Sequence, residues 1–493
     1  MDDQREAGSM PVSVPANTDL FFGGDWHKPA EGGRIKVVSP STGAQIAEVA
    51  AGSAADLDLA VAAATRAQAH WRRTAPLERA RKMRAAAERV RAHKAELAAL
   101  DALDCGNPLK GMEFDVELGA TLMEFFAGLA TEIKGETVPV GAARLNYVQR
   151  VPLGVVARIV PFNHPVMFLC AKMAAPIIAG NAVIMKPSEH TPLSALRVAE
   201  LVSDLFPKGL FNVLNGDGTL GAAMAGHPGI ANVSVVGSVQ TGRAVMREGA
   251  ATLKRVTLEL GGKNALVIYP DADIERAVEG AVKGMNLGWT AGQSCGATSR
   301  VFAHDDVYDE VVSRLADAFE AVTPGDPLDP ETEMGSLSTR AQYDKTLSYI
   351  ALAKDEGARL AAGAAALPAG LEQGLFVRPT LFADVRHDMR IAREEVFGPV
   401  LSVLRWSDHA HMVEQVNGVE YGLTASIWTR DLETAFRAVD SIDAGYVWIN
   451  NSSDHFLGAP FGGVKQSGIG REECLEELLG YTEQKNVSVT LGT

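Results

Sequence analysis

The stretch VVARIVPFNHPVMFLCAKMAAPIIAGNAVIMK (155–186) decides the fold. Its first six residues, VVARIV (155–160), are an apolar run of strand length, residues 166–179 have the length of a helix, and AVIMK (182–186) is a second apolar strand. Gly180 and Asn181 supply the turn that separates the helix from the second strand. A strand, a helix and a strand in this order predict a βαβ unit, whose two strands lie parallel in one sheet.

The same alternation continues along the chain. We predict further strands at LFNVL (210–214), ANVSVV (231–236), RVTLEL (255–260), ALVIY (265–269), TSRVFA (298–303), PVLSVLRW (399–406), TASIWT (424–429) and GYVWIN (445–450). The helices between them include one that Thr191 and Pro192 open and that runs to about Phe206, and another at 273–287. Apolar strands separated by helices are typical of parallel sheets covered on both faces. We therefore expect two successive α/β blocks, with a loop-and-helix insertion at 324–376.

Helices and a hairpin accompany these blocks. Ser53 and Asp56 form a capping box at the start of one helix, and Thr74 and Pro76 open a second long helix that continues through Leu97. Residues 132–139 and 145–151 are two extended segments joined by a Gly-Ala-Ala turn, which predicts a hairpin. An isolated hairpin is only marginally stable. We therefore expect it to pack against something else, such as another subunit.

One apolar run, at 166–185, is nearly long enough to span a bilayer. It contains Lys172, Pro176, Gly180 and Asn181, and it divides into a helix, a turn and a strand. We therefore interpret it as a buried helix–strand unit. The N-terminal MDDQREAGSM is acidic and polar, which favours neither a secretory nor a transit peptide.

Length, charge and cysteine content exclude several classes of protein. At about 150 residues per domain, 493 residues correspond to about three domains. Lys and Arg total 46 against 61 Asp and Glu, a net charge of −15, which argues against nucleic-acid binding. The four cysteines form no CxxC pair, which favours a reducing, cytoplasmic compartment and excludes both a disulfide framework and a clustered metal site. We expect no metal.

Two residues stand out as candidates for catalysis. Cys295 lies in the small-residue segment GQSCG (292–296), which lets a substrate approach the sulfur closely, although most cysteines in a reducing compartment are small buried hydrophobes. Glu259 interrupts an apolar strand just before Gly261 and Gly262, at the strand end where ligands of open α/β sheets collect. A desolvated carboxylate there can act as a general base, while a salt-bridged structural glutamate is the alternative.

Glycine-rich turns after strands suggest a dinucleotide site. GDGTLG (216–221) fits G-x-G-x-x-G, but Thr241 and Arg243 stand where an acidic residue is expected. The turn GSVQTG (237–242) also follows a strand and begins a helix, so its N–H groups can hold a pyrophosphate. Lys186 and Glu189 follow the adjacent strand, where they can bond ribose hydroxyls.

Together these residues resemble a known family. The motifs PFN (161–163), MKPSE (185–189), LELGGK (258–263), GQSC (292–295), EVFGP (395–399) and PFGG (460–463) occur in the order and rough spacing of the NAD(P)-dependent aldehyde dehydrogenase superfamily. The resemblance extends from about residue 20 to the C-terminus. It implies an α/β fold with a Rossmann-type parallel-sheet cofactor domain, an α/β catalytic domain and a small β bridging element.

The resemblance assigns domain boundaries and an assembly. It implies an NAD-binding domain from 1–129 and 152–261, a catalytic domain from 262–465, and a bridging or oligomerisation element from 130–151 and 479–493. In the family such strands pair across subunits, so a homodimer or homotetramer is expected. The sequence does not choose between the two.

The resemblance also assigns the chemistry. Cys295 matches the nucleophile that forms a thiohemiacetal and then a thioester, and the Asn163 amide and the Cys295 backbone N–H match the oxyanion hole. Glu259 matches the base that activates water for thioester hydrolysis. Lys172 and Glu472 match positions used for proton relay or support.

Cofactor and substrate residues carry over in the same way. The cofactor positions are Val160, Pro161, Phe162, Lys186, Ser188, Glu189, Gly218, Gly221, Gly237, Ser238, Thr241, Leu260, Gly261, Glu395 and Phe397. A carboxylate at Glu189 repels a 2′-phosphate, so we expect NAD rather than NADP. The substrate positions are His164, Phe168, Ala171, Ser294, Ser453, Phe456 and Phe461. We expect His164 to pack against substrate rather than to catalyse.

Two departures from the family bear on the substrate. Phe162 stands where many members have Trp, and Ala171 replaces a bulky aromatic residue or an Arg that anchors a carboxylate. The expected substrate is therefore an aromatic or medium-chain aliphatic aldehyde. Alternatives are a coenzyme-A-acylating enzyme, which typically lacks the carboxylate of Glu259, a non-catalytic structural use of the fold, and a cysteine hydrolase.

Overall fold

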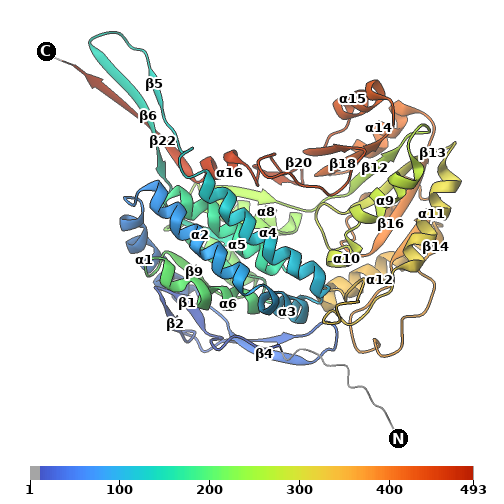
Figure 1. Cartoon of the computed structure of the whole chain (residues 1–493), viewed down its shortest axis with the longest axis horizontal. Coiled ribbons are helices and arrows are strands. Elements are labelled where there is room, and N and C mark those ends of the chain that lie inside the picture. Colours follow the sequence, from blue (N-terminus) through green and yellow to red (C-terminus); the bar gives the residue numbers. More distant parts are fainter. Residues whose placement is uncertain (1–11, 492–493) are drawn as a thin grey trace, which may run out of the picture.

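Two large sheets of mainly parallel strands organise the computed structural model, which describes residues 12–491 (Figure 1). The N-terminal decapeptide, for which the sequence predicts no targeting signal, lies outside the described residues. The last two residues of the predicted bridging element, 492 and 493, do so as well.

The first sheet has the strand order β2-β1-β9-β8-β7-β10-β11-β21. Its five central strands are parallel and correspond to predicted strands: β9 (Phe211–Val213), β8 (Ala182–Lys186), β7 (Val155–Ile159), β10 (Asn232–Val236) and β11 (Arg255–Glu259). The outer strands β1 (Leu20–Phe22), β2 (Asp25–His27) and β21 (Gly468–Ile469) pair antiparallel. The carboxyl ends of the central strands therefore lie along one edge of the sheet.

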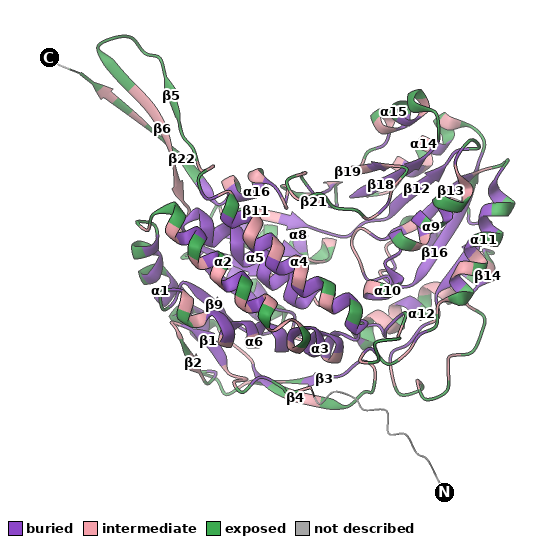
Figure 2. Ribbon diagram, in the orientation of Figure 1, coloured by how far each residue is buried: buried purple, intermediate pink, exposed green. Residues whose placement is uncertain are grey.

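Helices cover this sheet. They are α1 (Ala54–Trp71), α2 (Pro76–Ala92), α3 (Lys94–Cys105), α4 (Leu109–Gly128), α5 (Pro165–Ala179), α6 (Leu193–Val202), η1 (Ser203–Leu205), α7 (Gly218–Gly226) and α8 (Val239–Ala250). Helix α4 packs against both α5 and α2 (Figure 1). Every residue of α5 is buried, and Figure 2 shows this helix in the interior. Its apolar sequence thus reflects burial between other elements.

The second sheet has the order β14-β15-β16-β13-β12-β18-β19. Its strands are β12 (Asn264–Ile268), β13 (Thr298–His304), β14 (Arg359–Ala362), β15 (Thr380–Ala383), β16 (Val400–Trp406), β18 (Thr424–Trp428) and β19 (Tyr446–Ile449), and only the β14–β15 pair is antiparallel. The helices are α9 (Ile274–Gly284), α10 (Leu287–Thr290), α11 (Tyr308–Ala321), α12 (Arg340–Asp355), α13 (Arg390–Arg393), α14 (His409–Asn417) and α15 (Leu432–Ser441). Two separate hydrophobic cores draw on its strands, as expected for a sheet covered on both faces.

A three-stranded antiparallel arm projects from the first block (Figure 1). It contains the predicted hairpin, β5 (Glu136–Val138) and β6 (Arg144–Pro152), and the C-terminal strand β22 (Thr482–Thr490), which pairs with β6 along its whole length. The hairpin prediction is thus confirmed. The remaining small elements are β3 (Arg34–Val38), β4 (Gln45–Ala50), β17 (Tyr421–Gly422), β20 (Val464–Lys465) and α16 (Leu475–Gly480).

Some boundaries differ from the predictions. The second predicted helix is two helices, because His93 leaves the helical conformation and its Nδ1 bonds the Arg89 carbonyl at 2.9 Å. The helix predicted at 273–287 ends at Gly284, and Asn286 then takes a left-handed conformation with φ 54°. No helix within residues 12–491 combines the length and apolar character that crossing a membrane requires.

Candidate active site

A cavity of about 630 Å³ lies between the two blocks. It brings together nine of the predicted site residues, namely Cys295, Glu259, Lys172, Glu472, His164, Phe168, Ser294, Ser453 and Phe461. These come from α5, the end of β11, the turn before β13 and the segment after β19. Residues far apart in the sequence thus line one space.

Cys295 lies in the turn between α10 and β13. The turn is tight, with Ala291 and Gly292 both at positive φ, and Gly292 packs against the backbone of Gly398 so closely that a side chain has no room there. Cys295 is the only one of the four cysteines that is partly exposed. Burial, followed by the nearby Glu259 carboxylate, raises the pKa of its thiol well above the ordinary value. The thiol therefore needs a proton acceptor before it can attack as thiolate.

Glu259 is the last residue of β11 and is buried. Burial, and next the negative charge of Glu472, raise the pKa of its carboxyl well above the ordinary range, while the Cys295 thiol and Lys172 oppose this shift. Its Oε1 has no hydrogen-bond partner within residues 12–491. A buried carboxylate with a raised pKa and a free oxygen is suited to taking a proton from a thiol or from water.

A buried ion-pair network lies behind Glu259. Lys172 Nζ donates to Glu472 Oε2 at 2.6 Å, and an Arg158 Nη lies 3.3 Å from Glu472 Oε1 and 3.6 Å from a Glu477 oxygen. Burial acts to raise the pKa of Glu472, but Lys172 and Arg158 hold it below its ordinary value. Glu472 is therefore anionic beside Glu259, which favours the protonated form of Glu259.

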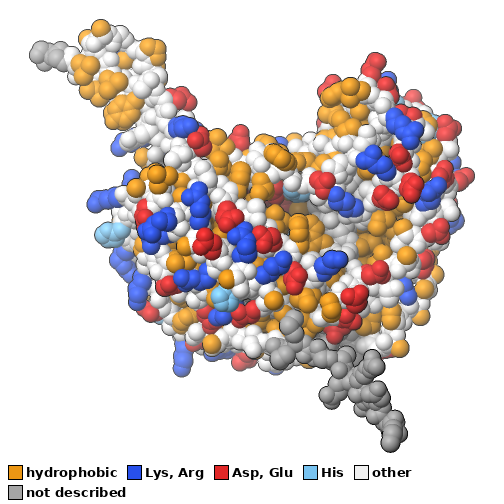
Figure 3. Space-filling view, in the orientation of Figure 1, with side chains coloured by type: hydrophobic (Ala, Val, Ile, Leu, Met, Phe, Trp, Pro, Cys, Tyr) orange, Lys and Arg blue, Asp and Glu red, His pale blue; other side chains and the backbone are white. Residues whose placement is uncertain are grey.

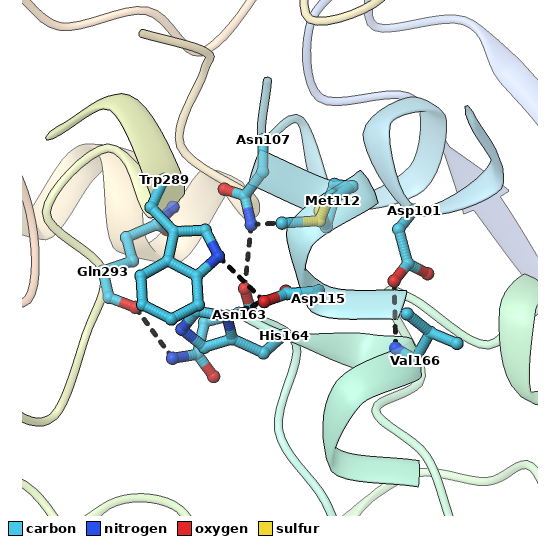
Figure 4. A network of polar contacts seen from close by, with 10 residues as sticks. Asp101, Asn107, Met112, Asp115, Asn163, His164, Val166, Trp289 and Gln293 are labelled. Atoms are coloured by element: carbon cyan, nitrogen blue, oxygen red, sulfur yellow. Dashed lines mark hydrogen bonds and ion pairs between the residues drawn. The ribbon is translucent and has the colours of Figure 1, made fainter. Parts of the chain in front are cut away.

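Asn163 lies next to the turn that carries Cys295 but does not line the cavity itself. Its Nδ2 donates to the Gln293 carbonyl at 2.8 Å, and the Asn107 Nδ2 donates to the Asn163 carbonyl at 2.8 Å (Figure 4). An amide nitrogen carries two hydrogens. One of those of Asn163 is thus used to fix its orientation, and the other has no acceptor among residues 12–491.

Most predicted cofactor positions follow the carboxyl ends of the central strands of the first sheet. Val160, Pro161 and Phe162 follow β7; Lys186, Ser188 and Glu189 end or follow β8; Gly218 and Gly221 follow β9; Gly237, Ser238 and Thr241 follow β10; Leu260 and Gly261 follow β11. Lys186 is buried and lies 3.5 Å from the Glu189 carboxylate. Ser238 caps α8 by accepting from the Thr241 N–H at 3.1 Å. This edge of the sheet is the usual ligand crevice of an open α/β fold.

Glu395 and Phe397 reach this edge from the second block. The Glu395 Oε1 accepts from the Gly262 N–H at 2.9 Å, and a side chain at Gly261 would collide with the same carboxylate. Phe397, at φ 62°, packs edge-on against Phe162 with 6.0 Å between the ring centroids. The two blocks therefore meet at the predicted cofactor residues, close to the turn of Cys295.

Two predicted substrate residues do not line the cavity. Ala171 is buried in α5, one position before Lys172, and Phe456 is 77 % exposed, whereas its neighbours His455 and Leu457 line the cavity. Lining residues that the sequence analysis missed include Phe114, Leu118, Leu122, Met167, Trp289 and Leu457. The first three recur at every fourth position of α4, and this amphipathic spacing is the signal that could have found them.

The chain is similar to known proteins along nearly its whole length. A family model described as "Aldehyde dehydrogenase family" matches residues 26–487. The aldehyde dehydrogenase tropH of Talaromyces stipitatus is 48 % identical, and the match covers 97 % of this chain and 95 % of that protein. A betaine aldehyde dehydrogenase of Sinorhizobium fredii is 42 % identical, and the match covers 96 % of this chain and 97 % of that protein. The NAD+ complex of an aldehyde dehydrogenase from Bacillus cereus has a TM-score of 0.93 and 39 % identity, covering 96 % of this chain and 97 % of that one.

Proposed function

The chain belongs to the aldehyde dehydrogenase family and is an oxidoreductase of aldehydes. From this premise, we propose that it oxidises an aromatic or medium-chain aliphatic aldehyde to the carboxylic acid with NAD+. The observation that carries the proposal is the cavity in which the partly exposed Cys295 and the buried Glu259 face each other. The solved relative with bound NAD+ supports the choice of cofactor.

The roles of the residues follow from their chemistry. Glu259 accepts the proton of Cys295, and the thiolate attacks the carbonyl carbon to form a thiohemiacetal. The second amide hydrogen of Asn163 and the Cys295 backbone N–H stabilise the oxyanion. Loss of hydride to a bound nicotinamide would leave the acyl group on Cys295 as a thioester. Glu259 then passes its first proton to solvent and takes one from the water that attacks the thioester, and the Cys295 thiolate leaves as the acid is released. Lys172 and Glu472 support this step by holding a fixed charge beside the base.

The residues at the carboxyl edge of the first sheet fit NAD. Lys186 and Glu189 offer a cation and a carboxylate to ribose hydroxyls, Ser238 and the adjacent glycines begin α8 as a pyrophosphate contact, and Glu395 and Phe397 lie toward the nicotinamide side. When bound there, NAD+ supplies the hydride acceptor. The carboxylate of Glu189 disfavours a 2′-phosphate, which is the reason to expect NAD rather than NADP.

The lining of the cavity favours an uncharged substrate. Its acids are Glu259, Glu333, Asp454, Glu472 and Glu473, against two lysines, Lys172 and Lys283, and no arginine. Lys172 pairs with Glu472, and Lys283 pairs with Asp454, so neither cation is free to hold a substrate carboxylate. The remaining wall is largely apolar and aromatic, including Phe114, Leu118, Phe168, Trp289 and Phe461, and it accommodates a ring or a medium-length chain.

The acylating alternative is disfavoured by Glu259, because a carboxylate that activates water is not required when a thiol receives the acyl group. We further assign 1–129 and 152–261 to NAD binding, 262–465 to catalysis, and 130–151 with 479–493 to assembly as a homodimer or homotetramer. The arm of β5, β6 and β22 supports this last assignment because it extends away from both blocks.

A substrate panel tests the proposal. NADH formation at 340 nm is measured with benzaldehyde, hexanal, acetaldehyde and succinate semialdehyde, each with NAD+ and with NADP+. We expect benzaldehyde or hexanal with NAD+ to give the highest kcat/KM, and Cys295→Ser to abolish NADH formation. A preference for succinate semialdehyde contradicts the substrate class, and a preference for NADP+ contradicts the role of Glu189.

A further inference from the structure

His164 occupies an unusual position in the wall of the cavity. It follows Asn163 and directly precedes α5. Its ring packs edge-on against two aromatic rings, with 4.7 Å between the ring centroids of His164 and Trp289 and 5.6 Å between those of His164 and Phe168. The side chain is nearly buried, yet the residue lines the cavity. A polar ring is therefore fixed in an otherwise largely apolar wall.

Asp115 of α4 fixes one side of this ring. The His164 Nδ1 lies 2.9 Å from Asp115 Oδ2, and the Trp289 Nε1 donates to Asp115 Oδ1 at 2.8 Å (Figure 4). An indole N–H is only a donor, so Asp115 acts there as an acceptor, and an ionised carboxylate accepts at both oxygens. Burial raises the pKa of Asp115, while His164 and the Trp289 N–H oppose that shift by stabilising its charged form. With Asp115 ionised, the imidazole proton lies on Nδ1.

The other side of the ring is free for a ligand. Within residues 12–491, Nε2 of His164 takes part in no hydrogen bond, and it is not among the fully buried polar atoms without a partner. With the proton on Nδ1, a neutral imidazole presents an acceptor lone pair at Nε2. The accessible surface of this nearly buried ring is on the cavity, so this lone pair is available to a bound substrate.

We propose that His164 is a specificity-determining residue, whose Nε2 accepts a hydrogen bond from a hydroxyl group on the substrate. The preferred substrate is then a hydroxyl-bearing aromatic aldehyde, in which the hydroxyl is separate from the reacting carbonyl. This inference rests on the proposed function and narrows its substrate class. A site built to hydrogen-bond a substrate hydroxyl discriminates against analogues that lack it, because its own polar atom is then left without a partner.

Asp115 has a positioning role in this proposal. Replacing it by Asn keeps one acceptor oxygen, to which the Trp289 N–H can still donate. The other oxygen becomes an NH₂ group that faces His164. The Nδ1 atom must then accept, which moves the imidazole proton to Nε2. Asp115→Asn thus converts Nε2 from an acceptor into a donor without changing the size of either side chain.

The test compares ring aldehydes that differ in one substituent. The kcat/KM values of benzaldehyde and of its 2-, 3- and 4-hydroxy and methoxy derivatives are measured with NAD+ at a pH low enough for each phenol to keep the proton that it must donate. For at least one ring position we expect the kcat/KM of the hydroxy compound to be about tenfold higher than that of benzaldehyde and that of the methoxy compound, a difference equivalent to about 1.4 kcal/mol. The methoxy group can accept a hydrogen bond but cannot donate one. His164→Phe should abolish this ratio, while His409→Phe, which alters a histidine bonded to Tyr269 outside the cavity, should preserve it.

The Asp115→Asn variant separates a hydrogen-bonding role from a merely structural one. We expect it to reduce the ratio of hydroxy to methoxy efficiency, because the donor at Nε2 now binds a methoxy oxygen as well. A structural defect alone would lower all efficiencies by similar factors and leave the ratio unchanged.

The outcomes are distinct. Equal efficiencies for hydroxy compounds and benzaldehyde in the unmodified enzyme, or an unchanged ratio in His164→Phe, overturn the role of His164 while leaving the proposed function intact. NADH formation from hexanal but from no ring aldehyde overturns the aromatic class and this inference together. Absence of NADH with every aldehyde contradicts the proposed function itself.

Discussion

At the scale of single residues, Glu259 raises the pKa of the Cys295 thiol, whereas the thiol lowers the pKa of the Glu259 carboxyl. Burial is the main cause of the raised pKa of both groups. Glu472 contributes a further negative charge behind Glu259, and Lys172 partly offsets it. One buried carboxylate is thus placed where it can serve both the thiol and the water that attacks the thioester.

Replacing Glu259 by Gln should separate the two halves of the reaction. The amide cannot take a proton from water, so we expect steady-state turnover to fall by about 100-fold or more, as is usual for loss of a general base. The first turnover should still yield an NADH burst that approaches one per active site, because without the carboxylate the pKa of the Cys295 thiol is lower and solvent can take its proton. Rapid mixing with absorbance at 340 nm measures both phases, and Glu279→Gln, which alters an exposed glutamate of α9, is the matched control. Unchanged steady-state turnover would remove the proposed role of Glu259.

The same substitution should change the pH dependence of the thiol. Glu259 raises the pKa of Cys295, so Glu259→Gln lowers that pKa, and the thiolate forms at lower pH. The rate of alkylation by iodoacetamide, followed against pH, should therefore shift toward lower pH in the variant. The other three cysteines are buried, so the accessible thiol is Cys295. Superimposable profiles would mean that the carboxylate does not act on the thiol.

Residues within motifs could be assigned from the sequence, because each motif fixes its own local backbone. Glu259 at a strand end and Cys295 in a small-residue turn are examples, and both line the cavity. The wall opposite the thiol could not be assigned, because Trp289 and Phe114 reach it from elements whose relative placement depends on tertiary packing. Phe456 shows the limit most clearly, because its two neighbours line the cavity while it faces solvent.

At the scale of elements, α3 supports the start of two other helices. The Asp101 Oδ2 accepts from the Val166 N–H at 2.9 Å in the first turn of α5, and the Asp104 Oδ2 accepts from the Leu193 N–H at 3.1 Å at the start of α6. Both carboxyls are fully buried. They satisfy N–H groups that have no partner within their own helices and lie at the positive ends of the helix dipoles. Since α5 begins directly after His164, this contact also positions the cavity wall.

Asp101 should make stability depend on pH. Burial raises its pKa to about 7, with Asp115 adding to the shift and Ser194 and Val166 opposing it, whereas a carboxyl in the unfolded chain titrates near 4. The folded chain therefore holds an extra proton between these values, and the free energy of unfolding should fall as pH rises through this window, by at most about 1.4 kcal/mol per pH unit.

Asp101→Asn removes this titration and keeps an acceptor for Val166. We expect the midpoint of thermal unfolding to decline less from pH 5 to pH 8 in the variant than in the unmodified chain. Asp317→Asn, at an exposed position of α11 that makes no ion pair within residues 12–491, serves as a comparison that should not change the slope. Parallel curves for the Asp101 variant and the unmodified chain would contradict the assignment of the pH dependence to Asp101.

Most elements of the two blocks were predictable because their strands are continuous apolar runs between turn residues. The short β1 to β4 and the helix α4 were not predicted. Three-residue strands such as β1 and β2 carry too little pattern to be distinguished from a loop, and they depend on pairing with each other and with β9. The break at His93 was missed because the apolar spacing continues across it, although the backbone of His93 leaves the helical conformation and its ring bonds the Arg89 carbonyl.

At the scale of the whole molecule, the cavity requires both blocks. The Gly262–Glu395 hydrogen bond and the contact between Phe162 and Phe397 join the edge of the first sheet to the second block. Phe461 and Glu472 pair through their backbones in both directions, at 3.0 and 2.7 Å, and so connect the aromatic wall with the ion-pair network behind Glu259. Neither block alone contains the whole set of groups that the proposed reaction needs.

The arm is the part of the molecule that the rest of the chain covers least. All of β5 is exposed, and the unpaired edges of the three-stranded sheet are those of β5 and β22. Val138 and Leu145 are 45 % and 43 % exposed, and Figure 3 shows apolar side chains gathered on the arm. A three-stranded sheet with free edges and exposed apolar side chains is suited to pairing with another chain. This supports the proposed assembly of like subunits.

Charges on the arm should therefore weaken assembly without affecting the fold of either block. The test is the double variant Val138→Glu, Leu145→Glu. Both side chains are exposed in the single chain, so we expect the stability of the folded subunit to change little. Two like charges placed in a buried intersubunit contact would destabilise that contact. At micromolar concentration, the sedimentation coefficient should therefore fall from that of a dimer or tetramer toward that of a monomer. The control is Leu77→Glu, Leu432→Glu, which adds the same charges at two exposed leucines outside the arm and should leave sedimentation unchanged. If the unmodified chain sediments as a monomer, or if the arm variant sediments like the control, the arm is not the surface through which subunits associate.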